Sequence, residues 1–260
     1  MPIRKGPSAS APGRAGYHHG DLRHALVAAT EAILVEAGVE GFSLREAARR
    51  AGVSPAAPAH HFGDASGLLT EVAVLGFEGL TAALQAADAT GGGDPAARLR
   101  AQAAAYVRYA LAHRARFQLM FRWRVLRGTD PRLSQAANAA FGTLEAAVRA
   151  AAGLDALAPL PTDVLAALIG AWSLPHGFAH LAIDGQFDHV AGTGSAMQVI
   201  EQILEPVMAR VPLPVSTAKR PAVARDMPPA ATPGGSRSAP RAPRTVRPAP
   251  RKLVGRKPTR

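Results

Sequence analysis

Residues 42–62 read FSLREAARRAGVSPAAPAHHF, and this stretch predicts two short helices joined by a tight turn. Ser43 and Glu46 have the spacing of a capping box, which satisfies free amide donors at a helix start, so a helix is expected to begin near Leu44. Gly52 is expected to end that helix, because a residue without Cβ tolerates the left-handed backbone that follows a last helical turn.

The second helix of the pair is expected to begin at Ser54 and Pro55. A serine hydroxyl can cap the first amides, and proline fits the first helical position because its missing N–H would have no partner there. Pro58 lies where an N–H would begin to bond inward, so a slight distortion is expected. Two helices joined so closely indicate a helix-turn-helix, whose second helix lies in the major groove of DNA.

A third helix is expected to share a small core with this pair. Residues 21–37 should form it, opening at Asp21 and stopping at Gly38, with an apolar face made of Leu22, Leu26, Ala29, Ile33 and Ala37. Three helices around one small core are the usual form of a helix-turn-helix unit.

The whole chain predicts an all-α fold with about nine helices. Glycine and proline breaks separate further helices over 66–87, 95–113, 114–126, 131–152, 162–183 and 195–210, and no convincing strand pattern occurs. Four segments are therefore expected: a disordered basic arm over 1–16, the helix-turn-helix DNA-binding domain over 17–65, a C-terminal regulatory and dimerisation domain over 66–210, and a disordered Pro/Arg-rich basic tail over 211–260.

Charge and composition separate the predicted folded part from this tail. The chain has 260 residues and a formal charge of +11, and residues 211–260 contain 12 Lys and Arg against one Asp, so the rest of the chain is neutral overall. The absence of cysteine excludes disulfides, thiolate catalysis and cysteine-based metal sites. The N-terminus has no signal-peptide core, and no later segment has the roughly 18 apolar residues that cross a bilayer, so a cytoplasmic location is expected.

Three stretches carry a family pattern when taken together. They are YHHGDLRHALVAAT and EAGVEGFSLREAARRAGVSPAAPAHHF within residues 17–62, and AWSLPHGF, in which Trp172, His176 and Gly177 form a Trp-x-x-x-His-Gly signature. They resemble the TetR/AcrR family of transcriptional regulators, in the branch that carries this signature. The resemblance implies an N-terminal DNA reader, an effector-binding C-terminal domain and a homodimer through about 162–210. Two-fold symmetry then implies a palindromic operator with half-sites about one helical turn apart.

The chain departs from the family pattern at two places. The family usually has an aromatic residue where this chain reads Ala59-His60-His61, and a lysine where it has Ala65 and Ser66. Both missing side chains would contact phosphates, which set affinity and register more than sequence preference. We therefore hypothesise that the basic arm and tail replace part of this attraction, in which case deleting residues 211–260 flattens the salt dependence of DNA binding.

Candidate DNA-contacting residues lie mostly in and beside the second helix of the pair. Ala56 and Ala57 can offer methyl groups to thymine, and Ser54 and His60 can hydrogen-bond to bases or phosphates. His61 either faces DNA or packs against the core. The full set is Tyr17, Arg45 with Arg49 or Arg50 as phosphate ligands, Ser54, Ala56, Ala57, His60 and His61.

Candidate effector-pocket residues are aromatic and polar side chains of the C-terminal region. They are Tyr109, Phe117, Met120, Phe121, Trp123, Trp172, His176 and His180. In an all-α domain such a group is more often core than a ligand wall, and both interpretations stay open. Pro175 favours a pocket, because it removes a backbone bond and is expected to kink its helix beside Trp172 and His176. A mostly apolar effector with one hydrogen-bonding group would fit there.

Two other functions are weaker alternatives to a dimeric, ligand-responsive DNA-binding regulator that acts as a repressor. His176, His180 and Asp184 share one helical face and could bind Zn²⁺, but no second cluster closes the shell, so no metal or other cofactor is predicted. The first alternative is a metal- or His-dependent enzyme on a helical scaffold. Phosphate loops, nucleophile elbows and paired carboxylates are missing from the sequence, so no catalytic residue is predicted. The second is a non-specific DNA-coating protein that uses the basic tail.

Overall fold

The computed structural model describes residues 19–191 and 195–212, and within these residues the fold is all-α. Tyr17, the basic arm and nearly all of the basic tail lie outside the described residues, and the predictions about them remain predictions. The helices are α1 His19–Ala37, α2 Leu44–Arg50, α3 Ala57–Phe62, α4 Ala65–Thr90, α5 Pro95–Ala112, α6 Arg114–Met120, α7 Pro131–Ala152, α8 Thr162–Ile183, α9 Asp188–Ala191 and α10 Ala196–Met208. The predicted all-α class with about nine helices is confirmed, and the four-residue α9 is an addition.

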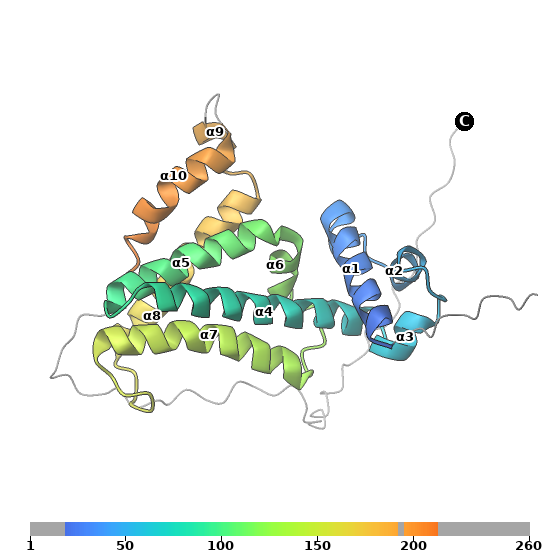
Figure 1. Cartoon of the computed structure of the whole chain (residues 1–260), viewed down its shortest axis with the longest axis horizontal. Coiled ribbons are helices and arrows are strands. Elements are labelled where there is room, and N and C mark those ends of the chain that lie inside the picture. The colour runs from blue at the N-terminus through green and yellow to red at the C-terminus, as the bar shows by residue number, and fades with distance from the viewer. Residues whose placement is uncertain (1–18, 192–194, 213–260) are drawn as a thin grey trace, which may run out of the picture. The chain divides into compact units, whose positions relative to one another are not determined.

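Helix α4 organises the described part of the chain. Its apolar residues, among them Leu68, Val72, Leu80 and Leu84, are buried, and it packs most extensively against α7 and α5. Figure 1 shows α1, α2 and α3 together at one end of α4, with α7 running alongside it. The helix-turn-helix and the C-terminal helices therefore share one long element.

Two helices correct the expectation that no segment is apolar enough to cross a bilayer. By length and composition alone α4 and α8 pass that test, with mean hydropathies of 1.4 and 1.3 over their best windows. Two such helices are weak evidence for a membrane span, since core helices pass the same test. In α4 67% of that window is buried inside the protein.

The start of α2 follows the predicted cap. Ser43 has an extended backbone, and its hydroxyl accepts a hydrogen bond from the Glu46 N–H at 3.2 Å. Only this half of the capping box forms, because the Glu46 carboxylate binds Arg49 and Arg50 instead. After the helix, Gly52 has φ of 68°, which is the left-handed conformation expected of it.

The prediction that α3 begins at Ser54 and Pro55 is wrong. The helix begins at Ala57, and Ser54 forms a turn in which its carbonyl accepts from the Ala57 N–H at 3.0 Å. Pro58 is consequently the second residue of the helix, where a missing N–H costs no hydrogen bond. The reason for expecting a distortion at Pro58 therefore does not apply, and Pro58 is buried.

Other boundaries also differ from the sequence predictions. Helix α1 begins at His19, and Ala37 at its end is exposed rather than part of the buried face. Helix α6 ends at Met120 instead of continuing to residue 126, because the Arg122 N–H bonds to the Leu119 carbonyl at 2.9 Å in a tighter turn. Val211, assigned to the tail, is buried in the core.

A buried carboxylate ties α1, α4 and α7 together. Glu71 of α4 is 5% exposed. It accepts hydrogen bonds from Arg23 Nε at 3.1 Å and from Arg132 Nη1 at 2.9 Å. Burial alone would raise the pKa of Glu71, but the two arginines outweigh burial and the pKa is lowered. Glu71 is therefore ionised in the folded protein and joins α1 to α4 and α7.

Acid is expected to weaken the fold through this carboxylate. A carboxyl whose pKa is lowered on folding stabilises the protein above its unfolded pKa of about 4.3, and this stabilisation is lost as pH falls through the folded pKa. Glu71→Gln should therefore lower the free energy of unfolding by about 1 kcal/mol at pH 7 and much less at pH 3, since both arginines are half exposed. Denaturant unfolding at the two pH values measures this, and the exposed Glu78→Gln on the same helix is the control. Equal losses at both pH values would contradict it.

Candidate functional site

The helix-turn-helix presents some of the predicted DNA-contacting residues on its surface. Ser54, Ala56 and His60 are exposed. Ala57 is half-buried and packs against the core, so it is less accessible than these three residues. His61 is also half-buried, with its ring centroid 5.3 Å from that of His60 and 6.4 Å from that of Phe62. The exposed surface is thus made of one hydroxyl, one imidazole and small methyl groups.

The arginines of α2 divide into free and engaged side chains. Arg49 and Arg50 both bind Glu46, and the hydrogen bond from Arg49 is the main cause that lowers the pKa of Glu46 to about 2. Arg50 also pairs with Glu36 at 2.7 Å. Arg45 is exposed and makes no hydrogen bond or ion pair with another described residue. Of the arginines weighed as phosphate ligands, Arg45 is the one left available.

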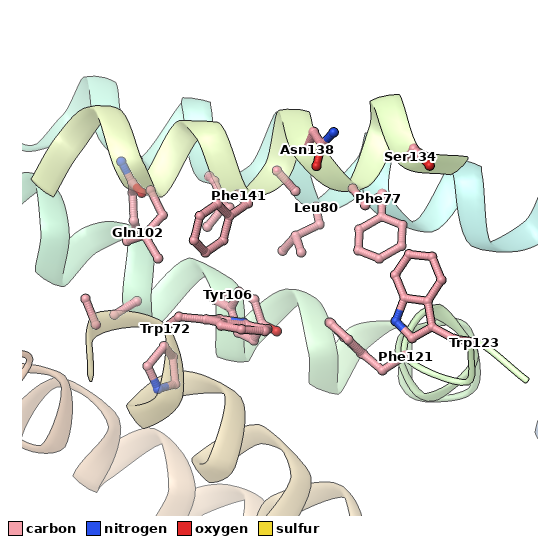
Figure 2. A pocket seen from close by; sticks show the side chains of 17 residues that line it. Phe77, Leu80, Gln102, Tyr106, Phe121, Trp123, Ser134, Asn138, Phe141 and Trp172 are labelled. Carbon is pink, nitrogen blue, oxygen red and sulfur yellow. The ribbon is translucent and has the colours of Figure 1, made fainter. Parts of the chain in front are cut away.

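A second feature is a cavity of about 380 Å³ among α4, α5, α7, α8 and the loop that follows α6 (Figure 2). Alanines of α5, α7 and α8 are among its lining residues, and their small side chains leave space between larger aromatic ones. The lining residues are Phe77, Leu80, Leu84, Gln102, Ala103, Tyr106, Phe121, Trp123, Ser134, Ala137, Asn138, Ala140, Phe141, Leu144, Ala171, Trp172 and Pro175.

Of the predicted effector-pocket residues, three line this cavity. They are Phe121, Trp123 and Trp172. Tyr109, Phe117 and Met120 are buried in the core beside it, as the alternative core interpretation had it. Pro175 lies inside α8 and lines the cavity together with Ala171, whose carbonyl it cannot bond.

The two histidines of α8 do not line the main cavity. His176 Nδ1 lies 2.8 Å from the hydroxyl of Tyr106, which does line it. Burial first, and then the nearby His180, lower the pKa of His176 to about 4, so the imidazole is neutral and holds Tyr106 in place. His180 lines a separate open hollow with Asp184. Among the described residues no group of three or more His, Cys, Asp and Glu is placed to hold a metal ion.

Sequence reasoning missed the polar residues of the cavity and its α4 and α7 walls. Gln102, Ser134 and Asn138 were not predicted, nor was the contribution of Ala140. A weak signal exists for Gln102, because it falls on the buried face of α5 between apolar residues. Nothing comparable marks the alanines, since an alanine beside a void and an alanine in a packed core look alike in sequence.

One loop joins the cavity to the junction of α3 and α4. It follows α6, and its residues Phe121 and Trp123 line the cavity. Arg127 of the same loop donates from Nη2 to the Phe62 carbonyl at the end of α3, at 3.1 Å, and to Asp64 Oδ1 at 2.9 Å. Its backbone N–H donates to Thr70 Oγ1 at 2.8 Å. A shift of this loop would therefore act directly on the end of α3.

Comparison with known proteins places the C-terminal helices in a described domain family. Residues 99–210 match the model of the tetracyclin repressor-like C-terminal domain. A search of curated proteins found no match.

Solved structures extend this likeness to most of the chain. A Rhodococcus sp. RHA1 protein of unknown function is 35% identical, with 76% of this chain and 100% of that chain covered and a TM-score of 0.61. The TetR family regulator PfmR from Thermus thermophilus is 23% identical over 70% of this chain and 96% of its own, with a TM-score of 0.52. A tetR family regulatory protein from Rhodococcus RHA1 is 21% identical over 74% and 97%, with a TM-score of 0.53. The last two likenesses concern the fold alone.

Proposed function

Because the chain belongs to the TetR family of transcriptional regulators, which bind DNA and are not enzymes, we propose that it is a repressor released from a palindromic operator by a small, mostly apolar effector. The observation that carries the proposal is the loop after α6, which lines the cavity and also holds the end of α3 through Arg127. The enzyme alternative is set aside. A cytoplasmic location follows from the proposed role at DNA.

The proposed DNA reader is the helix-turn-helix within residues 17–65, with α3 in the major groove. His60, Ser54 and Ala56 would face base edges, because they are the exposed members of the predicted set. Arg45 would bind a phosphate, since its guanidinium is not engaged elsewhere in the described residues. Ala57 and His61 remain secondary candidates because both are half-buried.

The proposed regulatory domain covers residues 66–210 and responds to the cavity. An effector would release DNA only if it bound more tightly to a conformation in which the two readers no longer match the operator. Occupying the cavity pushes on Phe121 and Trp123, and the same loop carries Arg127 to the α3–α4 junction. Arg122 of this loop also pairs with Glu40, which adds a second connection to the DNA-reading helices.

A homodimer through about 162–210 is supported by an unpartnered apolar stripe on α8. Leu165, Ile169 and Leu181 are 41%, 44% and 48% exposed, and with Ser173 and Gly177 they recur at four-residue spacing. Residues four apart are neighbours on the helix surface and are offset by about 40°, so this row winds round α8, and the exposed large apolar side chains along it favour burial against a second copy. Two readers related by two-fold symmetry would then meet two operator half-sites.

Removing the free arginine of α2 is expected to weaken operator binding without changing its sequence preference. Arg45→Ala should raise the dissociation constant about tenfold and lower the slope of log affinity against log salt by about one, as loss of one phosphate contact does. Fluorescence anisotropy with an operator duplex at several salt concentrations measures both quantities.

The control for this variant is Arg124→Ala. Arg124 is also exposed and unpaired among the described residues, but it lies on the loop after α6, outside the helix-turn-helix. The Arg124→Ala variant removes the same charge as Arg45→Ala, so a general effect of charge on DNA binding would appear equally in both variants. Equal salt slopes for the two variants would overturn the assignment of Arg45.

A further inference from the structure

The cavity offers no charged partner to a ligand. None of its lining residues is Asp, Glu, Lys, Arg or His. Its one titratable group is the phenol of Tyr106, whose pKa is raised by burial, while Trp172 opposes this in part, so the phenol stays neutral. A charged molecule would lose its hydration there and gain no counter-ion, which is costly. These walls therefore select an uncharged ligand.

One hydrogen-bonding atom of the cavity wall lacks a partner. Gln102 is 1% exposed and donates from Nε2 to Asp88 Oδ1 at 2.7 Å. Its Oε1 is buried without any hydrogen-bond partner, and it is the one such side-chain atom among the described residues. An unpaired buried acceptor costs about 1–3 kcal/mol, so a donor that reached it would regain that free energy.

A charged pair behind the wall fixes which way the Gln102 amide is oriented. Arg98 Nε donates to Asp88 Oδ1 at 2.9 Å, and the hydrogen bond from Arg98 is the main cause that lowers the pKa of Asp88. An ionised carboxylate only accepts hydrogen bonds, so Gln102 must turn its NH₂ group toward Asp88. The atom without a partner is therefore an acceptor that is itself buried, so a ligand that bonds to it must supply the donor and displace the groups that now cover it.

The size and shape of the cavity limit the ligand further. Its volume of about 380 Å³ is at the small end of ligand pockets, which run from about 300 to 1,000 Å³. Phe141 and Trp172 meet edge to face, with ring centroids 5.9 Å apart, and provide flat apolar walls. Ser134 and Trp123 are exposed and lie at the opposite end of the lining from Gln102 (Figure 2), so a ligand enters there.

We propose that the effector is an uncharged, largely apolar ring compound with one hydroxyl or N–H group, and that this group donates a hydrogen bond to Oε1 of Gln102. The inference rests on the proposed effector role of this cavity. Gln102 is then the residue that sets specificity, because it distinguishes a donor from a group of the same shape that only accepts.

The test uses three probes of similar shape and the full chain. They are para-cyclohexylphenol, its methyl ether and para-cyclohexylbenzoate, which is an anion at neutral pH. Both tryptophans of the chain, Trp123 and Trp172, line the cavity, so their fluorescence reports occupancy directly. The phenol should bind about tenfold more tightly than the ether, and the benzoate should not bind measurably.

Matched variants show whether Gln102 causes this preference. Gln102→Met keeps the side-chain length and should abolish the difference between phenol and ether, while Gln135→Met, on the exposed face of α7, should keep it. Ala140→Phe should fill the cavity and block both probes, and Ala139→Phe, which is exposed on the same helix, should block neither.

Each other outcome overturns the inference. Equal binding of phenol and ether, a preference that survives Gln102→Met, tight binding of the benzoate, or no binding of any probe would each do so. If Ala140→Phe still binds the phenol, the cavity is not the site, and the proposed effector role fails with the inference. Operator binding is also measured without any probe. If it is retained, only the ligand assignment has failed, and if it is absent, the proposed repressor function has failed.

Discussion

Replacing Gly67 with alanine is expected to lower the free energy of unfolding by about 2–3 kcal/mol, because it overpacks the junction of α3 and α4. A Cβ at Gly67 would collide with the carbonyl oxygen of Phe62, which is backbone and cannot rotate away. It would also lie 2.8 Å from the Arg127 guanidinium, which holds the same junction. The change should therefore loosen α3 as well as destabilise the fold.

Chemical denaturation measures this loss, and Gly142→Ala is the matched control. Gly142 lies inside α7, where an added Cβ would have nothing within 4 Å. Alanine is the better helix former by about 1 kcal/mol, so this variant should be slightly more stable than the parent. A Gly67→Ala variant as stable as the control would mean that the α3–α4 junction is not packed as described.

Replacing Ile169 with arginine is expected to give a monomer that binds the operator at least 100-fold more weakly. Ile169 lies on the exposed stripe of α8, between Leu165 and Ser173. A charge there would have to be buried unpaired in the proposed interface. Losing the dimer removes the second half-site contact, and linked binding of two modules is worth about 10²–10⁴ in affinity.

Analytical ultracentrifugation and operator titration measure the two parts of this prediction. Leu157→Arg is the control, since Leu157 is 97% exposed in the loop before α8 and belongs to no stripe. It should remain dimeric and bind DNA as the parent does. A dimeric Ile169→Arg variant would place the interface elsewhere.

The fold could be predicted from the sequence because the features that begin and end its helices are local in the chain. The caps and glycine stops are local features, and the bounds of α7 and α8 agree with the predicted 131–152 and 162–183. The prediction of where α3 starts was wrong for a local reason too. Ser54 and Pro55 satisfy the rules for a helix start, but Pro58 satisfies them as well and is the proline that the helix uses.

The candidate site was less predictable because it depends on packing between distant segments. Aromatic composition identified Phe121, Trp123 and Trp172, but it could not separate them from Phe117 and Met120, which are core. The orientation of the Gln102 amide group depends on Asp88 and Arg98. The role of Arg127 depends on the carbonyl of Phe62, 65 residues away in the chain. Such relations appear only once the helices are assembled.

Sequence-specific DNA recognition by α3 is tested most directly by sequencing the genomic fragments that the purified protein retains at moderate salt, beside a His60→Ala variant of the exposed α3 surface. We expect the parent to enrich a shared palindrome with half-sites about one helical turn apart, and the variant to lose or change the bases at fixed positions in each half. Fragments with no common sequence, retained equally by both proteins, would contradict the account and favour a DNA-coating protein that acts through its basic tail.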